Sequence, residues 1–287
     1  MRRMGLTAGI LLIVLGGIIA YESVGYSPVK RAFHQQKQQL VEASSLGRPE
    51  VFSKQEIARL PRSLRKYLEH CGFAEQPKMR YSIAKFESVD FVLNVGQKPL
   101  KIDYERVNDG NQPNALALID TRLYGIPFQG IDAYVNNQGS MKGVLGKQFT
   151  LFDETREDFY ISCLVTYLSE CLIVPSVVFQ DFITWEEVDS QTVKGTLKHS
   201  GYEVSGIFYF SARGELERFT TEDRIAIDPS GNKSKAPWTA KFSEYVEENG
   251  LLHPKRLQAI WHYPAGDSIY FDGEMVSLQY GYDEKGK

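Results

Sequence analysis

Glu170 is the residue whose type and setting best fit chemistry in this sequence. It lies near the end of a mostly apolar run at residues 159–179, FYISCLVTYLSECLIVPSVVF. A carboxylate buried among apolar side chains must find a partner or stay protonated. Such a group can hold the polar head of a ligand or act as an acid or base catalyst. The alternative is a polar helix edge close to solvent.

A buried Glu170 needs a basic partner. Arg224, in the segment TEDR, is the partner that we expect, and Lys241 is the alternative. The candidate ligand-binding set adds four amphipathic aromatic residues to Glu170 and Arg224, and these are Trp238, Tyr245, Trp261 and Tyr270. Aromatic residues of this kind also pack in cores and at their rims, which is the alternative role for all four.

Motifs for other chemistry are absent from the sequence. It contains no Gly-x-Gly-x-x-Gly, P-loop, His-Glu-x-x-His, Cys-x-x-Cys or Gly-x-Ser-x-Gly. The histidines lack the spacing of a metal site, and they are His34, His70, His199, His253 and His262. We therefore assign no catalytic residue and no metal ligand, and we expect no cofactor.

Charge and cysteine content exclude further classes. The net charge is −3 and the basic residues are scattered, so we expect no nucleic-acid partner. An odd number of cysteines at irregular spacing is not a disulfide framework. Cys71, Cys163 and Cys171 are expected to be small buried residues, although a bridge from Cys71 to either of the others stays open.

The first apolar run, MGLTAGILLIVLGGIIAY at residues 4–21, contains no charge. As a helix it would be about 27 Å long, close to the thickness of a bilayer core. Arg2 and Arg3 precede it, which predicts a cytoplasmic N-terminus and an extracytoplasmic remainder. A cleaved signal peptide is the alternative, but Ile18 is bulky for a cleavage site ending at Ala20. We predict a single-pass cell-membrane anchor at residues 1–21.

The second apolar run predicts a buried helix rather than a second membrane span. Its polar residues follow one narrow stripe at helical spacing, and they are Asp158, Ser162, Thr166, Ser169 and Glu170. Pro175 ends the run after about 16 residues, which is short for a bilayer. This helix is therefore expected inside the protein.

The remaining sequence predicts an α+β fold that is mostly antiparallel β. Residues 22–52 are polar and are interpreted as a juxtamembrane helix and spacer, with a solvated linker preferred. Residues 53–287 form a single domain that begins with a Ser53–Glu56 capping box and a short helix. Alternation such as Val193 and Leu197 in TVKGTLKH then predicts strands with one buried face. We expect one curved, half-barrel-like sheet packed on the buried helix.

The segment from Leu60 to Tyr280 resembles an uncharacterised family of bacterial, often membrane-associated proteins, known only as a domain of unknown function. The similarity is carried by LPRSLRKYL, YLSECLIVPS and PWTAKFSEYVEENGLLHP, followed by AIWHYPAGDSIYFDGEMVSLQY. Thr166 stands where the family usually has arginine, and Ile173 where it has tryptophan. The resemblance implies a shared domain and no particular reaction.

Three functions from different classes are compatible with these features. The first is a membrane-anchored envelope domain that binds a lipid or acyl chain between the curved sheet and the helix. The second is a non-catalytic scaffold that docks another envelope protein through an exposed edge strand. The third is a hydrolase that uses Glu170 as acid or base. Binding is preferred, so an enzymatic role is not expected.

Overall fold

The computed structural model describes residues 16–17, 20–21, 24–44, 50–93, 96–227 and 233–282, with the backbone alone for Asp158, Ile227 and residues 233–235. The predicted anchor at residues 4–21 lies outside this range, apart from Gly16, Gly17, Ala20 and Tyr21. Among the described residues, no helix combines the length and the apolar character that a membrane span requires.

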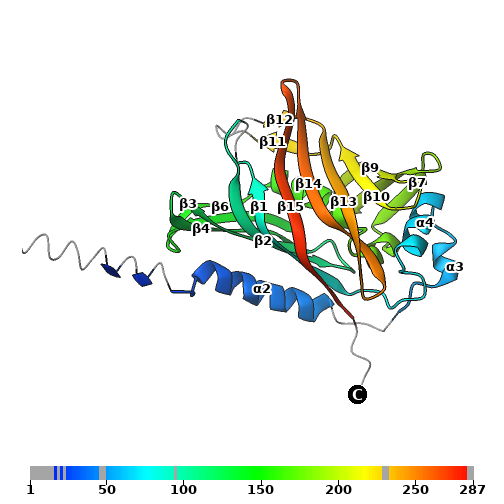
Figure 1. The fold of residues 1–287 in the computed structure, drawn as a ribbon, viewed down its shortest axis with the longest axis horizontal. Coiled ribbons are helices and arrows are strands. Elements are labelled where there is room, and N and C mark those ends of the chain that lie inside the picture. The colour runs from blue at the N-terminus through cyan, green and yellow to red at the C-terminus, as the bar shows by residue number, and fades with distance from the viewer. Residues whose placement is uncertain are drawn as a thin grey trace, which may run out of the picture.

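One large antiparallel sheet forms the body of the molecule (Figure 1). Thirteen of the described strands follow the order β6-β5-β4-β3-β2-β1-β15-β14-β13-β10-β9-β8-β7. Their bounds are β1 (Tyr81–Phe91), β2 (Leu100–Asp109), β3 (Ala115–Leu123), β4 (Ile126–Val135), β5 (Gln138–Leu145), β6 (Phe149–Thr155), β7 (Ile183–Glu187), β8 (Thr192–His199), β9 (Tyr202–Phe210), β10 (Leu216–Thr221), β13 (Trp238–Glu248), β14 (Leu251–Tyr263) and β15 (Gly266–Gly281). A separate ribbon joins β11 (Ile225–Ile227) to β12 (Lys233–Lys235). The single curved sheet confirms the fold class expected from strand alternation.

Helices α2, α3 and α4 precede the sheet, and α5 and a 3₁₀ helix lie between β6 and β7 in the chain. Their bounds are α2 (Pro28–Ser44), α3 (Lys54–Ile57), α4 (Arg62–His70), α5 (Glu157–Glu170) and the 3₁₀ helix η1 (Pro175–Phe179). The predicted capping box is present, because the Ser53 hydroxyl accepts from the Glu56 backbone N–H and the Glu56 carboxylate accepts from that of Ser53. Gly72 follows α4 at φ +81°, a conformation that glycine adopts without strain.

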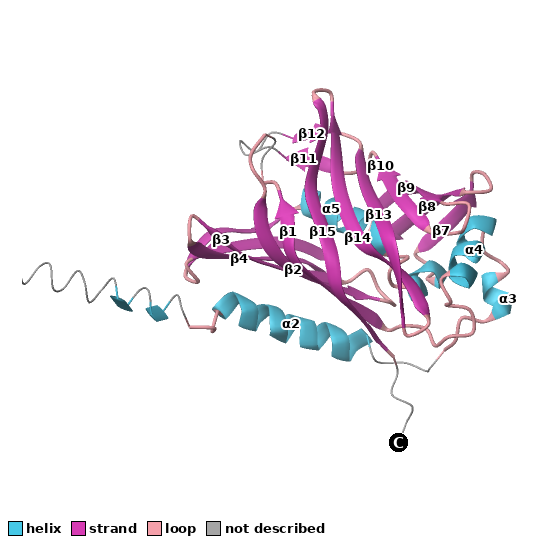
Figure 2. Ribbon diagram, viewed as in Figure 1, coloured by secondary structure: helices cyan, strands magenta, loops and turns pink. Residues whose placement is uncertain are grey.

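Helix α5 lies within the curve of the sheet, behind β13–β15 in Figure 2. It packs against β4 and β5 on one side and against β8 and β9 on the other, so it bridges two distant parts of the sheet. Leu164, Val165 and Leu168 are fully buried in the main hydrophobic core. This confirms the prediction that the second apolar run is a core helix.

Alternation along β8 is as predicted. Val193 and Leu197 are fully buried, and Gly195 lies between them on the same face. A Cβ at Gly195 would lie 2.7 Å from the Trp185 ring and 2.9 Å from the Phe208 ring. The inner face at this position therefore has room only for glycine.

Helix α2 covers the opposite face of the sheet, beneath β2–β4 (Figure 1). Val29, Phe33 and Leu40 are buried there against Leu116 and Ile131, among other apolar residues of the sheet. Lys37 also pairs with Glu105 of β2, with 2.6 Å between Nζ and Oε1. The helix expected in residues 22–52 is therefore present, but the preferred interpretation of this stretch as a solvated linker is wrong for α2. Its sparse apolar residues were not recognised as one helical face in a glutamine-rich segment.

Replacing Phe33 with alanine tests whether α2 belongs to the folded domain. The side chain is fully buried, so its loss should lower the free energy of unfolding by about 3–5 kcal/mol. Urea unfolding of the full chain measures this loss, and Gln36→Ala on the exposed side of α2 is the matched control. Equal stabilities of the two variants would show that α2 is not packed on the sheet.

Candidate functional site: an apolar cavity inside the sheet

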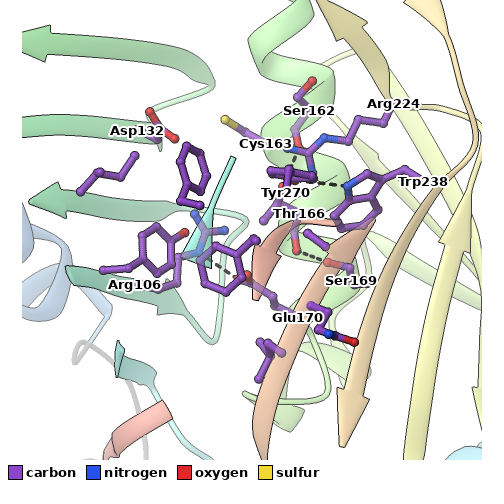
Figure 3. Close-up of a pocket in the computed structure, with 18 of the residues that line it drawn as sticks. Arg106, Asp132, Ser162, Cys163, Thr166, Ser169, Glu170, Arg224, Trp238 and Tyr270 are labelled. Carbon is purple, nitrogen blue, oxygen red and sulfur yellow. Dashed lines mark hydrogen bonds and ion pairs between the residues drawn. The ribbon is translucent and has the colours of Figure 1, made fainter. Parts of the chain in front are cut away.

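A cavity of about 240 Å³ lies between α5 and the middle strands of the sheet (Figure 3). This volume is slightly below the range of about 300–1,000 Å³ that is usual for small-molecule pockets. The cavity exists because α5 contacts the sheet near its two edges, while β1, β2 and β13–β15 arch over the helix. Most of its lining is apolar.

The apolar wall consists mainly of aromatic rings from the middle strands. Phe271 of β15 lies edge-on to Phe86 of β1 and to Tyr104 of β2, with ring centroids 5.7 and 5.3 Å apart. Ile119, Phe242 and Leu257 also line the cavity, and Phe159 adds a ring from α5. These contacts give the wall a fixed shape, since such aromatic pairs have preferred geometries.

Strand alternation places polar residues of β2 on the same inner face. Tyr104, Arg106 and Asn108 point toward α5, whereas Val107 between them packs on the α2 side. The Arg106 Nε donates to Glu170 Oε2 over 2.9 Å, and Asn108 Nδ2 donates to the same oxygen over 2.9 Å. The Arg106 side chain is only 7% exposed and that of Glu170 only 14%. A buried ion pair thus connects β2 to the end of α5.

The prediction that Arg224 or Lys241 pairs with Glu170 is wrong. Arg106 takes that position because β2, far from α5 in the sequence, faces the end of the helix. Lys241 is exposed on the outer surface. Burial lowers the pKa of the Arg106 guanidinium, but the adjacent Glu170 carboxylate outweighs this effect and the pKa rises. Arg106 is therefore cationic throughout the physiological range.

Arg224 lines the cavity but is held by aromatic rings and a hydroxyl group. Its Nη1 donates to Thr166 Oγ1 over 2.9 Å. The guanidinium carbon lies 4.6 Å from the Trp238 ring centroid and 5.7 Å from that of Trp261. Within the described residues, no carboxylate forms an ion pair with Arg224. Its remaining N–H groups are thus available to an acceptor in the cavity.

Asp132 of β4 is a further charged residue of the lining (Figure 3). Burial raises the pKa of this carboxyl group to about 6, although Arg106 and Arg224 oppose the shift. Within the described part of the chain, no hydrogen bond or ion pair is formed by its side chain. Asp132 is consequently close to half-protonated in mildly acidic solution and able to donate or accept a hydrogen bond.

Four of the six predicted site residues lie together around the cavity, namely Glu170, Arg224, Trp238 and Tyr270. Trp238 Nε1 donates to the Tyr270 hydroxyl over 3.2 Å, which orients both rings. Tyr245 lies elsewhere in the core, where its hydroxyl donates to the Leu216 carbonyl over 3.0 Å. Trp261 stacks on Tyr263 beside the cavity. Its ring also lies close to the guanidinium group of Arg224, which lines the cavity.

Arg106, Asn108 and Asp132 were missed from the sequence. Tyr104, Arg106 and Asn108 alternate in the segment YERVND, a pattern that could have indicated one strand face with polar residues. Nothing in the sequence indicates which strand faces the end of α5. Asp132 is surrounded by apolar residues in β4, which is an unusual position for a carboxylate in a strand with a buried face.

The structure supplies little that suits metal or thiol chemistry. Among the described residues, no group of three or more His, Cys, Asp or Glu side chains is arranged to hold a metal ion. Cys71, Cys163 and Cys171 are free thiols, so the bridge left open by the sequence does not form. Burial raises the pKa of Cys163, which lines the cavity, to about 12 and leaves it unreactive as a thiol.

These features define a curved antiparallel sheet protein with an aromatic cavity. Residues 50–273 match the profile of a family of unknown function, DUF6544, and the chain belongs to this family. The match confirms the resemblance found in the sequence. A search of curated proteins found no match.

Three solved structures show a distant similarity. A LolA superfamily protein from Nitrosomonas europaea is 9% identical, with a TM-score of 0.41 over 78% of this chain and 94% of that protein. A putative outer membrane lipoprotein-sorting protein domain from Vibrio parahaemolyticus is 11% identical, with a TM-score of 0.40 over 70% of this chain and 85% of that domain. A DUF1329 family protein from Desulfovibrio piger is 13% identical, with a TM-score of 0.38 over 91% of this chain and 96% of that protein. Similarity at this level carries no conclusion about ligand or activity.

Breaking the pair between Arg106 and Glu170 should destabilise the fold. Arg106→Leu leaves a buried carboxylate with Asn108 alone, and we expect a loss of about 3–5 kcal/mol in the free energy of unfolding. The double variant Arg106→Leu, Glu170→Leu removes both charges and should recover much of this loss. Urea unfolding measures the parent protein, the two single variants Arg106→Leu and Glu170→Leu, and the double variant, and additive losses would contradict the pairing. Glu274→Ala, which breaks an exposed pair with Lys255, is the control and should have little effect.

Asp132 should make the stability depend on pH. Its raised pKa means that the folded state binds a proton more tightly than the unfolded state. Proton binding by Asp132 therefore adds to the free energy of unfolding at low pH, and this stabilisation is lost as pH rises from about 4 to about 6. Asp132→Asn should therefore gain stability relative to the parent protein as pH rises through this range. Thermal unfolding at about pH 4.5 and about pH 7.5 measures the difference. The exposed Asp181→Asn is the control, and an equal response of both variants would refute the assignment.

Proposed function

We propose that this protein binds one acyl chain, or an apolar ligand of similar size, in the cavity between α5 and the curved sheet. The single observation that supports this function is an aromatic cavity with a few polar groups at defined places. Pockets of this composition are typical of small-molecule binding sites. The cavity volume of about 240 Å³ favours one chain over a lipid with several chains.

The polar groups favour a ligand with an anionic or hydrogen-bonding head. Arg224 carries N–H groups that have no partner among the described residues, and its position over Trp238 keeps it at the cavity. A carboxylate or phosphate oxygen would satisfy these donors. Arg106 is paired with Glu170 through Nε and would mainly shape the site, although its buried Nη2 atom has no hydrogen-bond partner among the described residues. In this arrangement the acyl chain of the ligand lies against the rings of Phe86, Tyr104 and Phe271.

The geometry argues against a hydrolase that uses Glu170. One carboxylate oxygen accepts hydrogen bonds from both Arg106 and Asn108, and the side chain is 14% exposed. A carboxylate held in this way is poorly placed to exchange protons with a substrate. We therefore propose a binding protein and not an enzyme.

The proposed setting is the cell envelope. The uncharged run at residues 4–21, preceded by Arg2 and Arg3, would anchor the chain by one span with its folded domain outside the cytoplasm. A domain in this place would have ready access to lipids and to their acyl chains. This location is a proposal from the sequence.

A variant with a filled cavity tests the proposed function. Ala259 lines the cavity, and Ala259→Phe places a ring in the space proposed for the acyl chain. We expect affinity for a fluorescent fatty acid, such as dansyl-undecanoic acid, to fall at least about tenfold, which is about 1.4 kcal/mol. Ala265→Phe, at an exposed turn, is the matched control and should bind normally.

The state of the purified protein supplies a second measurement. Native mass spectrometry of protein prepared without detergent should detect a co-purifying apolar molecule, and Ala259→Phe should lose it. Circular dichroism establishes that each variant is folded. Equal probe binding by both variants, or repeated isolation of empty protein that does not bind the probe, would refute the proposed function.

A further inference from the structure

One end of the molecule gathers exposed apolar side chains. We name this end the tip surface, and it consists of Val24, Tyr26, Tyr124, Ile126, Phe149 and Leu151. Tyr124 is fully exposed and Phe149 is 70% exposed. Six of the twelve exposed large apolar residues in the described part of the chain lie on this surface. Such clustering on a protein surface usually marks a site of interaction.

Two neighbouring hairpin turns carry the tip surface. Tyr124 and Ile126 belong to the turn between β3 and β4, and Phe149 and Leu151 follow the turn between β5 and β6. The Gly146 backbone N–H donates to the Pro127 carbonyl over 2.7 Å and thereby joins the two turns. These side chains are held by a rigid sheet.

The chain enters the folded domain at the same end (Figure 1). Lys147, in the turn between β5 and β6, donates from Nζ to the Tyr21 carbonyl over 3.0 Å and to the Val24 carbonyl over 2.7 Å. The ammonium group also lies 5.3 Å from the centre of the Tyr21 ring. Lys147 is 6% exposed, so this connection is well shielded from solvent. It fixes Tyr21 beside the two turns.

The position of Tyr21 suggests what covers the tip surface. The uncharged run begins at Met4 and ends at Tyr21, so a bilayer crossed by this run has its interface at Tyr21. Tyrosine residues concentrate at the level of lipid headgroups, and apolar side chains can enter the boundary beneath them. Arg122 is exposed at the turn between β3 and β4, where it can meet lipid phosphates.

We propose that the tip surface rests on the membrane that the anchor crosses, with Tyr124, Ile126 and Phe149 inserted at the lipid interface. This inference depends on the proposed anchor but not on ligand binding in the cavity. It assigns a second, independent membrane contact to the folded domain. The domain is thereby held in one orientation and does not rotate freely on its anchor.

Site-specific fluorescence of the full chain in phosphatidylcholine–phosphatidylglycerol vesicles tests the proposal. The environment-sensitive label NBD is attached at Ile126→Cys or Phe149→Cys, with Val188→Cys at the opposite edge of the sheet as control. All variants carry Cys163→Ser as a precaution against labelling there, because Cys163 is partly exposed whereas Cys71 and Cys171 are buried. We expect blue-shifted emission at positions 126 and 149, and several-fold stronger quenching by nitroxide-labelled lipids than at position 188.

Alkaline carbonate extraction of the same vesicles separates this inference from the anchor. If the protein resists extraction and the labels at positions 126 and 149 report water, the membrane contact is refuted and the anchor stands. If carbonate releases the protein, both proposals fail, whereas probe binding in the cavity is unaffected. Blue-shifted emission without quenching by lipids would indicate a protein partner or a second copy of this chain, and would also refute the proposal.

Discussion

The structure depends on the need of a long curved sheet to bury its inner face. A sheet of thirteen strands with one-sided alternation exposes a large apolar surface unless something fills the curve. Helix α5 fills it by packing against β4 and β5 on one side and β8 and β9 on the other. The middle strands pass over the helix at a distance, and the cavity lies in that space. The candidate site thus results directly from how the core is closed.

The pair between Arg106 and Glu170 fixes the helix against the sheet. Buried ion pairs contribute little net stability, because desolvation offsets much of their attraction. The two side chains of such a pair must nevertheless stay in contact, since a lost partner leaves an uncompensated charge in the interior. Glu170 is the last residue of α5 and Arg106 lies near the end of β2, so the pair joins the C-terminal end of the helix to the sheet. It also leaves Arg224 and Asp132 as the charged groups of the cavity that lack a carboxylate or basic partner among the described residues.

The outer face of the sheet is used as well. Helix α2 covers β2–β4 through Phe33 and its apolar neighbours, and it places residue 21 beside the turns that follow β3 and β5. Neighbouring residues of one strand therefore serve opposite faces: Val107 contacts the α2 side, and Arg106 contacts α5. Helix α2 is thus packed onto the domain that contains the cavity.

The sequence alone determined the classes of local structure. Period-two alternation predicted the strands, Ser53 and Glu56 predicted the start of α3, and the narrow polar stripe predicted that α5 is buried. These features depend on neighbouring residues, so they can be recognised without knowledge of the fold. The same stripe identified Glu170 as a residue that needs a partner. Amphipathic character identified Trp238 and Tyr270 as candidate residues of the site.

Only the tertiary structure decided which residues meet. Sixty-four positions separate Arg106 from Glu170, and no local pattern indicates that β2 faces the end of α5. The same reason explains why Arg224 was assigned to the wrong partner and why Tyr245 lies away from the cavity. Contacts of this kind depend on strand order and on the path of the sheet around its helix. Both are set by the packing of the whole chain and by no single segment of it.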